Sequence, residues 1–466
     1  MSSPTDRVAG VDSSTQSCKV VTVDPSTGRV LSLDQAPHPD GTEIDPQLWW
    51  EALQRVSDEV PTASAVAVAG QQHGLVTLDA QGNTVRPALL WNDVRSAPQA
   101  RALTEQLGRD AWVEAVGSVP IPSITVTKLA WMREREPELA DRVAQVLLPH
   151  DWLTWRLLGS PEATTTDRSE ASGTGYWSAT TGDYRMDLLE LAFGRTVGVP
   201  RVLAPSEPAG RTARGTVVGP GLGDNAAAAL GLGLRAGETV VSLGTSGAVF
   251  ASAADAEPDP SGELNRFADG EGQLLPLSCT MNAARVLGAV ATALGTDLAG
   301  MERLQAQAPL DADGAILLPY LDGERTPSLP EASGSLHGLR RSTMTPEHVA
   351  RAGVLGMLCG LADALDAVRR SGVPVEQVLL IGGAAQSQAV RSAAPEIFGV
   401  PVVVPEPGEY VALGAARQAA WVESGSDEPP VWERRVAAEI APSGEGWGQQ
   451  VRERYAAYRH QLYPHV

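Results

Sequence analysis

One acidic residue, Asp224, lies in a glycine-rich stretch near the middle of the 466-residue chain. The stretch reads Gly221-Leu222-Gly223-Asp224-Asn225-Ala226 and continues into a run of small residues. Glycine permits a tight turn and lets a ligand approach the backbone closely, but Asp and Asn are also good helix N-caps. The stretch therefore has two interpretations that are equally good on local grounds: a catalytic carboxylate on a turn, or an ordinary helix start.

A second acidic residue, Asp12, ends the apolar run Val8 to Val11 and precedes a hydroxyl-rich turn that contains Thr15. Similar turns follow apolar runs at Gly244 and at Gly382. Such turns present backbone N–H groups and hydroxyls to phosphate oxygens. Each turn alone is weak evidence, but three in one chain, two of them in matching contexts, favour a phosphate-bearing ligand.

Two common nucleotide signatures do not account for these turns. No G-x-x-x-x-G-K-[ST] segment occurs. The stretch 221–226 fits G-x-G-x-x-[G/A], but a dinucleotide site also needs an acid at the end of the next strand. Here Glu238 precedes that strand, and the strand ends in Leu243-Gly244-Thr245. We therefore do not expect a nicotinamide-dependent dehydrogenase.

Phosphoryl transfer fits the residues better, because it needs positioned phosphates, a divalent cation and a carboxylate that takes a proton. Asp224 is the candidate general base, and Asp12 is the candidate residue for Mg²⁺ or its bound water. Thr15 and Thr245 could donate hydroxyls to phosphate oxygens. The alternative for Asp12 is a carboxylate that caps a tight hairpin turn.

Four polar residues at expected strand ends could bind a polyol: Gln72, His73, Asn92 and Asp93. Their side chains supply the donors and acceptors that hydroxyl groups require. A buried histidine with satisfied hydrogen bonds is the alternative for His73. We interpret the neighbouring Trp91 as a core residue.

The elements that must position these residues indicate an α/β fold. Residues 8–33 predict an antiparallel meander, and residues 239–251 repeat its pattern of strand, hydroxyl turn and strand, which suggests an internal duplication. Further strands are expected at 65–69, 76–78, 89–91, 217–218 and 378–381. Helices are expected from Pro46, over 127–135, from Thr345 to Gly372 and over 449–462. Residues 164–175 read as a loop, and the Pro-, Gly- and Arg-containing segment 199–215 as a domain boundary.

The net charge of −20 argues against nucleic acid or an anionic membrane as a partner. The three cysteines are scattered, no apolar run is long enough to span a bilayer, and the first residues are polar. We expect a cytoplasmic protein whose partners are small molecules.

Taken in order, the motifs resemble the FGGY family of carbohydrate kinases over nearly the whole chain. The segments that carry the resemblance are Gly10-Val11-Asp12-Ser13-Ser14-Thr15, Gly70-Gln71-Gln72-His73-Gly74, Leu90-Trp91-Asn92-Asp93, Leu147-Leu148-Pro149-His150-Asp151-Trp152-Leu153, Ser169-Glu170-Ala171-Ser172-Gly173-Thr174, Gly223-Asp224-Asn225-Ala226-Ala227, Ser242-Leu243-Gly244-Thr245-Ser246-Gly247, Leu318-Pro319-Tyr320-Leu321 and Ile381-Gly382-Gly383-Ala384. Their order and spacing are specific, although no single segment is.

The resemblance implies two actin-like (ribonuclease-H-like) domains, residues 1–214 and 215–466, with a cleft between them. It implies transfer of the ATP γ-phosphate to a hydroxyl of a ketopentose, with D-xylulose as the expected substrate and Mg²⁺ as the metal. By match, the catalytic residues are Asp224 and Asp12, the latter also near the metal. The implied sugar contacts are Gln72, His73, Asn92, Asp93 and Asn225. The implied nucleotide contacts are Thr15, Gly244, Thr245, Ser246, Gly382, Gly383 and Ala384. A homodimer is an expectation from family analogy only.

Two alternatives stay open at this point. One is a kinase of the same family that acts on another sugar, sugar acid or polyol, such as ribulose, gluconate or glycerol. The other is a non-catalytic, actin-like nucleotide-binding protein. The chain also departs from common family patterns, with Ser14 where many relatives have Gly, Gln72 where Met is common, and a short segment before Asp224.

Overall fold

The computed structural model describes residues 7–56 and 60–464, which form two compact units. The first unit runs to Leu234 and adds residues 266–275 and 409–434, and the second holds residues 235–265, 276–408 and 435–466. The expected division after residue 214 therefore differs from the observed one. Asp224 belongs to the first unit, together with Asp12, and not to a C-terminal unit.

The sheet of the first unit has the strand order β11-β12-β5-β1-β2-β3, and β13 also pairs with β5. The predicted meander is confirmed, because β1 pairs antiparallel with β2 and β2 with β3. On its other side, β1 pairs in parallel with β5. The strands are β1 (Val8–Ser13), β2 (Ser17–Val23), β3 (Val30–Pro37), β5 (Ala65–Gly70), β11 (Gly210–Arg211), β12 (Val217–Val218) and β13 (Leu222–Gly223). Short pairs add β4 (Glu43–Ile44) with β7 (Ala88–Leu89), β6 (Val76–Leu78) with β8 (Gln145–Leu147), and β9 (Thr165–Asp167) with β10 (Arg201–Leu203).

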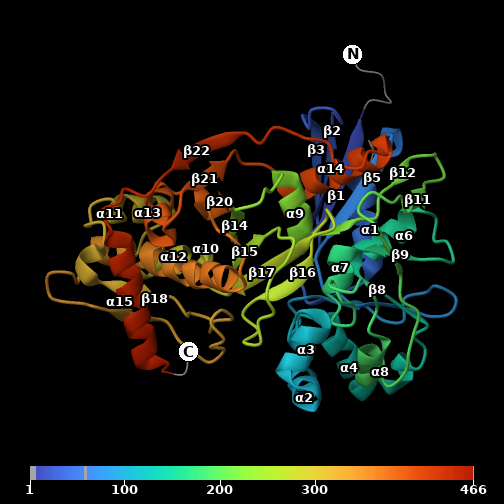
Figure 1. The fold of residues 1–466 in the computed structure, drawn as a ribbon, viewed down its shortest axis with the longest axis horizontal. Coiled ribbons are helices and arrows are strands. Elements are labelled where there is room, and N and C mark those ends of the chain that lie inside the picture. The colour runs from blue at the N-terminus through green and yellow to red at the C-terminus, as the bar shows by residue number, and fades with distance from the viewer. Residues whose placement is uncertain (1–6, 57–59, 465–466) are drawn as a thin grey trace. The chain divides into compact units, whose positions relative to one another are not determined.

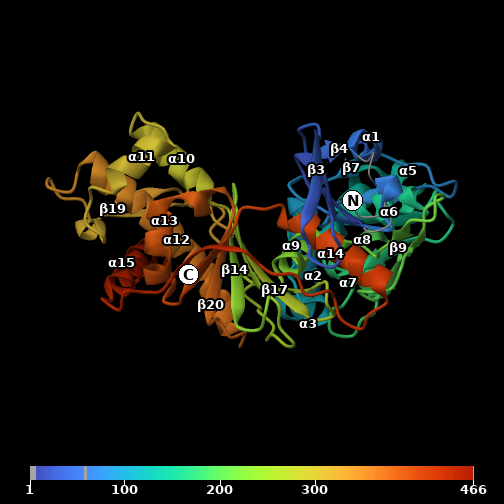
Figure 2. The ribbon, with the colours of Figure 1, turned by 90° about the horizontal axis from the view of Figure 1, so that it is seen from above.

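Strands β1 and β5 are buried along their whole length, as their nearly continuous apolar sequences predict for strands covered on both faces. Helix α14 (Tyr410–Ser424), from late in the chain, packs against β1, β5 and α9 (Asp224–Leu232), and its red ribbon lies among blue strands in Figure 1. Figure 2 shows the same adjacency of α9 and α14. Gly10 permits this contact, because a Cβ there would overlap the backbone of Ala412 and Ala416. The first unit is therefore completed by a segment nearly 200 residues downstream of its main body.

The remaining helices of the first unit cover the sheet and build a second apolar cluster around α4. They are α1 (Pro46–Val56), α2 (Ala97–Leu107), α3 (Arg109–Val116), α4 (Thr125–Arg135), α5 (Pro137–Ala140), α6 (Pro149–Leu157), α7 (Arg168–Ser172) and α8 (Met186–Phe193).

The prediction of a loop over residues 164–175 is wrong, because this segment contains strand β9 and helix α7. Asp167 is the N-cap of α7, and its side chain accepts from the backbone N–H groups of Ser169 and Glu170. A Ser-, Thr- and Asp-rich composition suits a loop, but it equally suits a short helix whose hydroxyls and carboxylates are hydrogen-bonded locally.

The sheet of the second unit is built around β15-β14-β20-β21-β22. Strand β14 pairs antiparallel with β15 and in parallel with β20, which repeats the relation of β1 to β2 and β5 and confirms the predicted duplication. The strands of this sheet in the second unit are β14 (Glu238–Leu243), β15 (Gly247–Ala251), β20 (Gln377–Ile381), β21 (Val402–Pro405), β22 (Val436–Ile440) and most of β17 (Leu274–Thr280). Strand β16 (Asn265–Ala268), which pairs with β17, lies mostly in the segment 266–275 of the first unit. Strands β18 (Ile316–Leu318) and β19 (Ser335–His337) form a separate pair. The helices are α10 (Ala284–Ala293), α11 (Leu298–Gln305), α12 (Pro346–Arg370), α13 (Gln388–Phe398) and α15 (Trp447–Leu462).

Helix α12 forms the core of the second unit, as its predicted apolar stripe and first-turn proline indicate. It is also the one helix among the described residues that is long and apolar enough to cross a bilayer. However, 83% of its most apolar stretch is buried inside the protein, as in a core helix. Helix α15 packs against α12, α13 and β18, in agreement with the docking helix predicted near the C-terminus.

Candidate active site

Three strands of the first unit end at one edge of its sheet and bring the two candidate carboxylates together. In the parallel pairing of β1 with β5, Asp12 lies opposite Ala69. In the pairing of β13 with β5, Gly223 lies opposite Gly70. Asp12 is the penultimate residue of β1, and Asp224 directly follows β13. The register of the sheet therefore places residues more than 200 positions apart at the same edge.

Asp12 is almost fully buried and under-satisfied. Its side chain is 4% exposed, Oδ1 has no hydrogen-bond partner, and Oδ2 accepts from Ser14 Oγ at 3.4 Å. Burial raises the pKa of Asp12 to about 7, while Lys19 opposes this rise and Asp224 adds to it. Lys19 lies opposite Asp12 on β2, and its ammonium donates to Glu409 at 2.6 Å. A buried carboxylate with an unused oxygen is suited to a cation.

Asp224 is the first residue of α9, and Gly223 is the N-cap, so the stretch does begin a helix, and this position is compatible with the catalytic interpretation. Its Oδ1 accepts from the backbone N–H of Asn225 at 2.8 Å and from Asn225 Nδ2 at 2.9 Å. Burial raises the pKa of Asp224 to about 6 in spite of these hydrogen bonds. The backbone N–H groups at the start of the helix would lower the pKa of this carboxylate, but burial outweighs them. Asp224 is thus a stronger base than a free aspartate and is still mostly ionised at neutral pH.

Two of the expected sugar contacts flank this edge. Gln72 is buried next to the residue that follows Asp224. Its Nε2 donates to the carbonyl of Ser169 at 3.2 Å, and its Oε1 accepts from Asn225 Nδ2 at 3.5 Å. His73 has a positive φ of 68°, its Nδ1 lies 2.7 Å from the carbonyl oxygen of Gly173, and its ring centroid is 5.5 Å from that of Phe267. Gln72 is therefore held in place by protein groups, whereas His73 is partly exposed.

The other two expected sugar contacts, Asp93 and Asn92, differ in how many hydrogen bonds their side chains make within the protein. Asp93 accepts from Thr42 Oγ1 at 2.7 Å and from Arg95 Nε at 2.9 Å. Burial would raise the pKa of Asp93, but the hydrogen bonds from Arg95 and Thr42 hold it below its ordinary value. Asn92 Oδ1 is buried and has no partner, which leaves an acceptor for a ligand hydroxyl.

Trp91 is partly exposed, so its interpretation as a core residue is wrong. Its indole N–H donates to Thr15 Oγ1 at 2.9 Å, and Thr15 Oγ1 lies 3.4 Å from Gln71 Oε1. The loop after β1 is thereby connected to the polar turn around Asn92. Ser14, at the position where relatives often have glycine, directs its hydroxyl to Asp12 and to the carbonyl of Ser17.

The expected nucleotide loops lie together in the second unit. Ser242 pairs with Ile381 in the parallel register of β14 and β20, so the loops that begin at Gly244 and Gly382 follow neighbouring strand ends. Gly382 has a φ of 95°, and a Cβ there would stand 2.5 Å from the carbonyl oxygen of Leu243, so this close contact requires glycine.

Most residues of these two loops are exposed and available to a ligand: Thr245, Gly382 and Gly383 are exposed, and Gly244, Ser246 and Ala384 are partly exposed. Arg285 supports the first loop, because its Nε donates to the carbonyl of Thr245 at 3.1 Å and its Nη1 pairs with Asp322 at 2.9 Å. Asp322, in the turn after Tyr320, therefore forms an ion pair with Arg285 that braces this loop.

A cation would have to be held by few protein ligands. Within residues 7–56 and 60–464, no group of three or more His, Cys, Asp or Glu side chains is arranged as a metal site. Mg²⁺ commonly binds through one or two carboxylates, water and substrate phosphates. Asp12, with its orphaned buried oxygen and raised pKa, fits that kind of site.

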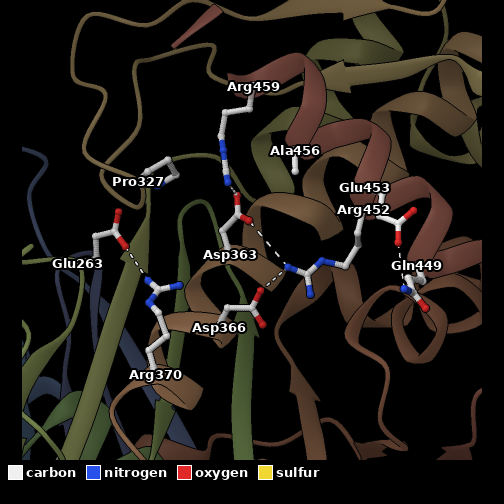
Figure 3. Close-up of a pocket in the computed structure, with 10 residues that line it drawn as sticks. All are labelled: Glu263, Pro327, Asp363, Asp366, Arg370, Gln449, Arg452, Glu453, Ala456 and Arg459. Atoms are coloured by element: carbon white, nitrogen blue, oxygen red, sulfur yellow. Dashed lines mark hydrogen bonds and ion pairs between the residues drawn. The ribbon is translucent and has the colours of Figure 1, made fainter. Parts of the chain in front are cut away.

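A cavity of ≈ 570 Å³ in the second unit contains none of the expected site residues. Figure 3 shows that charged side chains of α12 and α15 face one another across it. Asp363 pairs with Arg459 and lies 3.9 Å from Arg452, and Arg452 also pairs with Asp366. We interpret this cavity as the gap beside an ion-pair network that joins two helices.

The same sheet plan is repeated in two units, as in actin-like (ribonuclease-H-like) domains. The first unit holds the paired carboxylates, and the second holds the exposed glycine and threonine loops. This fold and these residues together define a kinase of small hydroxyl-bearing molecules. The N-terminal domain of the FGGY family of carbohydrate kinases matches residues 8–233, and the C-terminal domain of that family matches residues 239–423. The chain belongs to the FGGY family of carbohydrate kinases, and the resemblance seen in the sequence is confirmed.

Named relatives match over nearly the whole length. A xylulose kinase of Streptomyces coelicolor is 48% identical over 445 residues, which cover 92% of this chain and 90% of that protein. A xylulose kinase of Streptomyces rubiginosus is 47% identical with the same coverage. The crystal structure of xylulose kinase from Bifidobacterium adolescentis is 42% identical in sequence and superimposes with a TM-score of 0.91. The match covers 98% of this chain and 100% of that one.

Proposed function

We propose that this enzyme transfers the γ-phosphate of ATP to D-xylulose and forms D-xylulose 5-phosphate. The observation that carries the proposal is the sheet edge at which β1 and β13 present Asp12 and Asp224, both with raised pKa values. The xylulose kinase relatives, at up to 48% identity over 92% of the chain, support the choice of sugar.

Asp224 is the general base of the proposed reaction. With a pKa of about 6, it is ionised at neutral pH and still basic enough to accept a proton from a hydroxyl as that oxygen attacks phosphorus. Asn225 donates two hydrogen bonds to Oδ1, which leaves Oδ2 for the sugar hydroxyl. Asn92 Oδ1 and the His73 ring are the nearby groups that would orient the other sugar hydroxyls.

The nucleotide is held by the second unit. Thr245 and the exposed glycines after β20 would contact the phosphates through a hydroxyl and backbone N–H groups. Mg²⁺, held through Asp12, water and phosphate oxygens, would neutralise charge on the phosphates when it is bound. Proton removal by Asp224 and alignment of the sugar by its neighbours are the contributions of this chain's own residues.

The proposal is tested by measuring ADP release with ATP, Mg²⁺ and a panel of D-xylulose, D-ribulose, L-ribulose, gluconate and glycerol. We expect the highest kcat/KM with D-xylulose and a product phosphorylated at the 5-hydroxyl. Higher kcat/KM with any other member of the panel would overturn the sugar assignment. ADP release from none of the five would overturn the proposed function.

We also infer a reducing, cytoplasmic compartment, since no disulfide bond joins Cys18, Cys279 and Cys359 in the described part of the chain and two of them are buried. A homodimer is tested separately by the mass of the protein in solution.

A further inference from the structure

The turn that presents Asp224 has glycine on both sides of Leu222, so only the buried side chain of Leu222 fixes it from within. Gly221 has a φ of 93°, and a Cβ there would stand 2.6 Å from His150 Nδ1. A Cβ at Gly223 would stand 2.7 Å from Gln72 Nε2. Both positions therefore require glycine, which is also the residue that least restricts the backbone. A catalytic carboxylate on such a turn must be held by other parts of the protein.

Two buried side chains, distant in sequence, hold the two glycines by their backbone groups. Gln418 of α14 accepts from the N–H of Gly221 at 3.0 Å and donates to its carbonyl at 3.0 Å. Ser169 of α7 accepts from the N–H of Gly223 at 2.8 Å through its Oγ. Both side chains have 0% exposure, so water does not compete for these hydrogen bonds.

The hydroxyl of Ser169 is itself oriented by a buried ion-pair network. Its single proton is donated to Asp167 Oδ2 at 2.6 Å, which turns its lone pairs toward Gly223. Asp167 Oδ1 lies 3.0 Å from His150 Nε2, and His150 Nδ1 lies 3.5 Å from Asp151 Oδ1. Through these contacts the segments around His150 and Ser169, which the phosphoryl-transfer chemistry itself does not use, connect to the residue that precedes Asp224.

We propose that Ser169 and Gln418 are positioning residues for the reaction, which hold the Gly221–Gly223 backbone so that the Asp224 carboxylate is aimed at the substrate hydroxyl. The inference rests on the proposed role of Asp224. A misplacement of about 1 Å in a reacting group costs roughly 100-fold in rate, so a turn released from either contact lowers kcat while the sugar and nucleotide sites stay intact.

The test compares Ser169→Ala with a matched control, Ser172→Ala. Ser172 lies on the same helix, is equally buried, and its Oγ also makes two hydrogen bonds, to the carbonyl of Ser169 and from the N–H of Ala268. We expect kcat of Ser169→Ala to fall about 10- to 100-fold with both KM values within about two-fold. Ser172→Ala is expected to lose similar thermal stability and less than about three-fold in kcat.

Rescue and a second contact sharpen the test. Ser169→Thr keeps the hydroxyl and is expected to recover most of kcat. Gln418→Met removes both contacts with Gly221, and a double variant with Ser169→Ala is expected to lose less than the product of the single losses, because both act on one turn. If Gln418→Met does not fold, the comparison of Ser169→Ala with Ser172→Ala is sufficient to test the proposal. Equal kcat losses in Ser169→Ala and Ser172→Ala, or a loss that appears in KM only, would overturn the proposal.

Hydrogen exchange separates this inference from the proposed function. A peptide that covers residues 219–226 should exchange faster in Ser169→Ala than in the unmodified enzyme and in Ser172→Ala. If the enzyme phosphorylates no sugar, the proposed function fails, and this exchange difference still reports whether Ser169 holds the turn. If exchange over 219–226 is the same in all three proteins, the positioning role is wrong even when the kinase is active.

Discussion

The two carboxylate clusters of this protein differ in their partners. At the edge of the first sheet, no arginine of residues 7–56 and 60–464 forms an ion pair with Asp12 or Asp224, and burial raises their pKa values, although Lys19 opposes the rise at Asp12. In the second unit, Asp363 and Asp366 face Arg459 and Arg452, and burial, which would raise the pKa of both, is opposed by these arginines. For Asp366 the arginines prevail and hold its pKa below the ordinary value, whereas for Asp363 burial prevails and its pKa is raised.

We propose that this difference separates a cluster that takes part in the reaction from one that stabilises the fold. A buried carboxylate bonded to arginine has its charge matched and its lone pairs used, so it holds helices together. A buried carboxylate without that partner costs folding free energy and keeps its basicity and its free oxygen for a substrate or a cation. The following predictions test this division of roles, from the largest expected effect to the smallest.

Asp224→Asn removes the proton acceptor but preserves the Oδ1 acceptor for Asn225. We expect kcat to fall by about 10²- to 10⁴-fold, the usual contribution of a general base. Steady-state ADP release measures the loss, and nucleotide binding by calorimetry should be unchanged. Activity within about ten-fold of the unmodified enzyme would show that another group accepts the proton.

Asp363→Asn should have the opposite profile. It leaves Arg459 without its carboxylate partner in a largely buried position, and breaking such a pair typically costs about 3 kcal/mol. Thermal unfolding should show a clear loss of stability in the second unit, while kcat at 25 °C stays close to that of the unmodified enzyme. A large kcat loss without a change in unfolding temperature would show that this cluster takes part in the reaction.

At saturating Mg²⁺, which would keep Asp12 ionised, the pH dependence of kcat/KM should follow Asp224. Protonation removes the base, so kcat/KM should fall as pH decreases through about 6. At one pH unit below that pKa, activity should be roughly one tenth of the plateau. Substitution of Asp363 should leave this profile in place. A plateau that continues to pH 4.5 would show that the ionisation of Asp224 does not limit the rate.

The smallest effect is a gain in stability. Because burial raises the folded-state pKa of Asp224 to about 6 from an ordinary 3.8, ionisation of this group makes folding less favourable as pH rises from about 4 to 6. Asp224→Asn lacks this ionisation. Its unfolding temperature should therefore exceed that of the unmodified enzyme by a few degrees at pH 7, and the difference should shrink toward pH 4. An equal or lower unfolding temperature at pH 7 would contradict the pKa direction.

Local patterns in the sequence were sufficient to single out Asp12 and Asp224, which the fold brings to one sheet edge. Asp12 and Asp224 each follow a short apolar run at a turn, and the α/β duplication was visible in two repeats of strand, turn and strand. What the sequence could not reveal was burial and long-range pairing. The basicity of Asp224 depends on what surrounds it, and a composition rich in Ser, Thr and Asp did not distinguish helix α7 from a loop.

The positioning contacts show the same limit. Ser169 and Gln418 reach the glycine turn from 54 and 197 residues away, and a lone serine or glutamine in an ordinary helix has no local signature. The domain boundary was misplaced for a related reason, because helix α14 returns to the first unit from the far end of the chain.

The return of α14 also has a consequence for how the protein is made. On a ribosome, the strands and helices up to Leu234 are synthesised well before residues 410–424, which cover β1 and β5. At about 5–20 residues per second, this interval lasts roughly 10–35 s. During that time the nascent chain exposes an apolar sheet face that its own later helix has yet to cover. We expect a chain released before residue 424 to keep that face exposed and to be a target for chaperones and proteases.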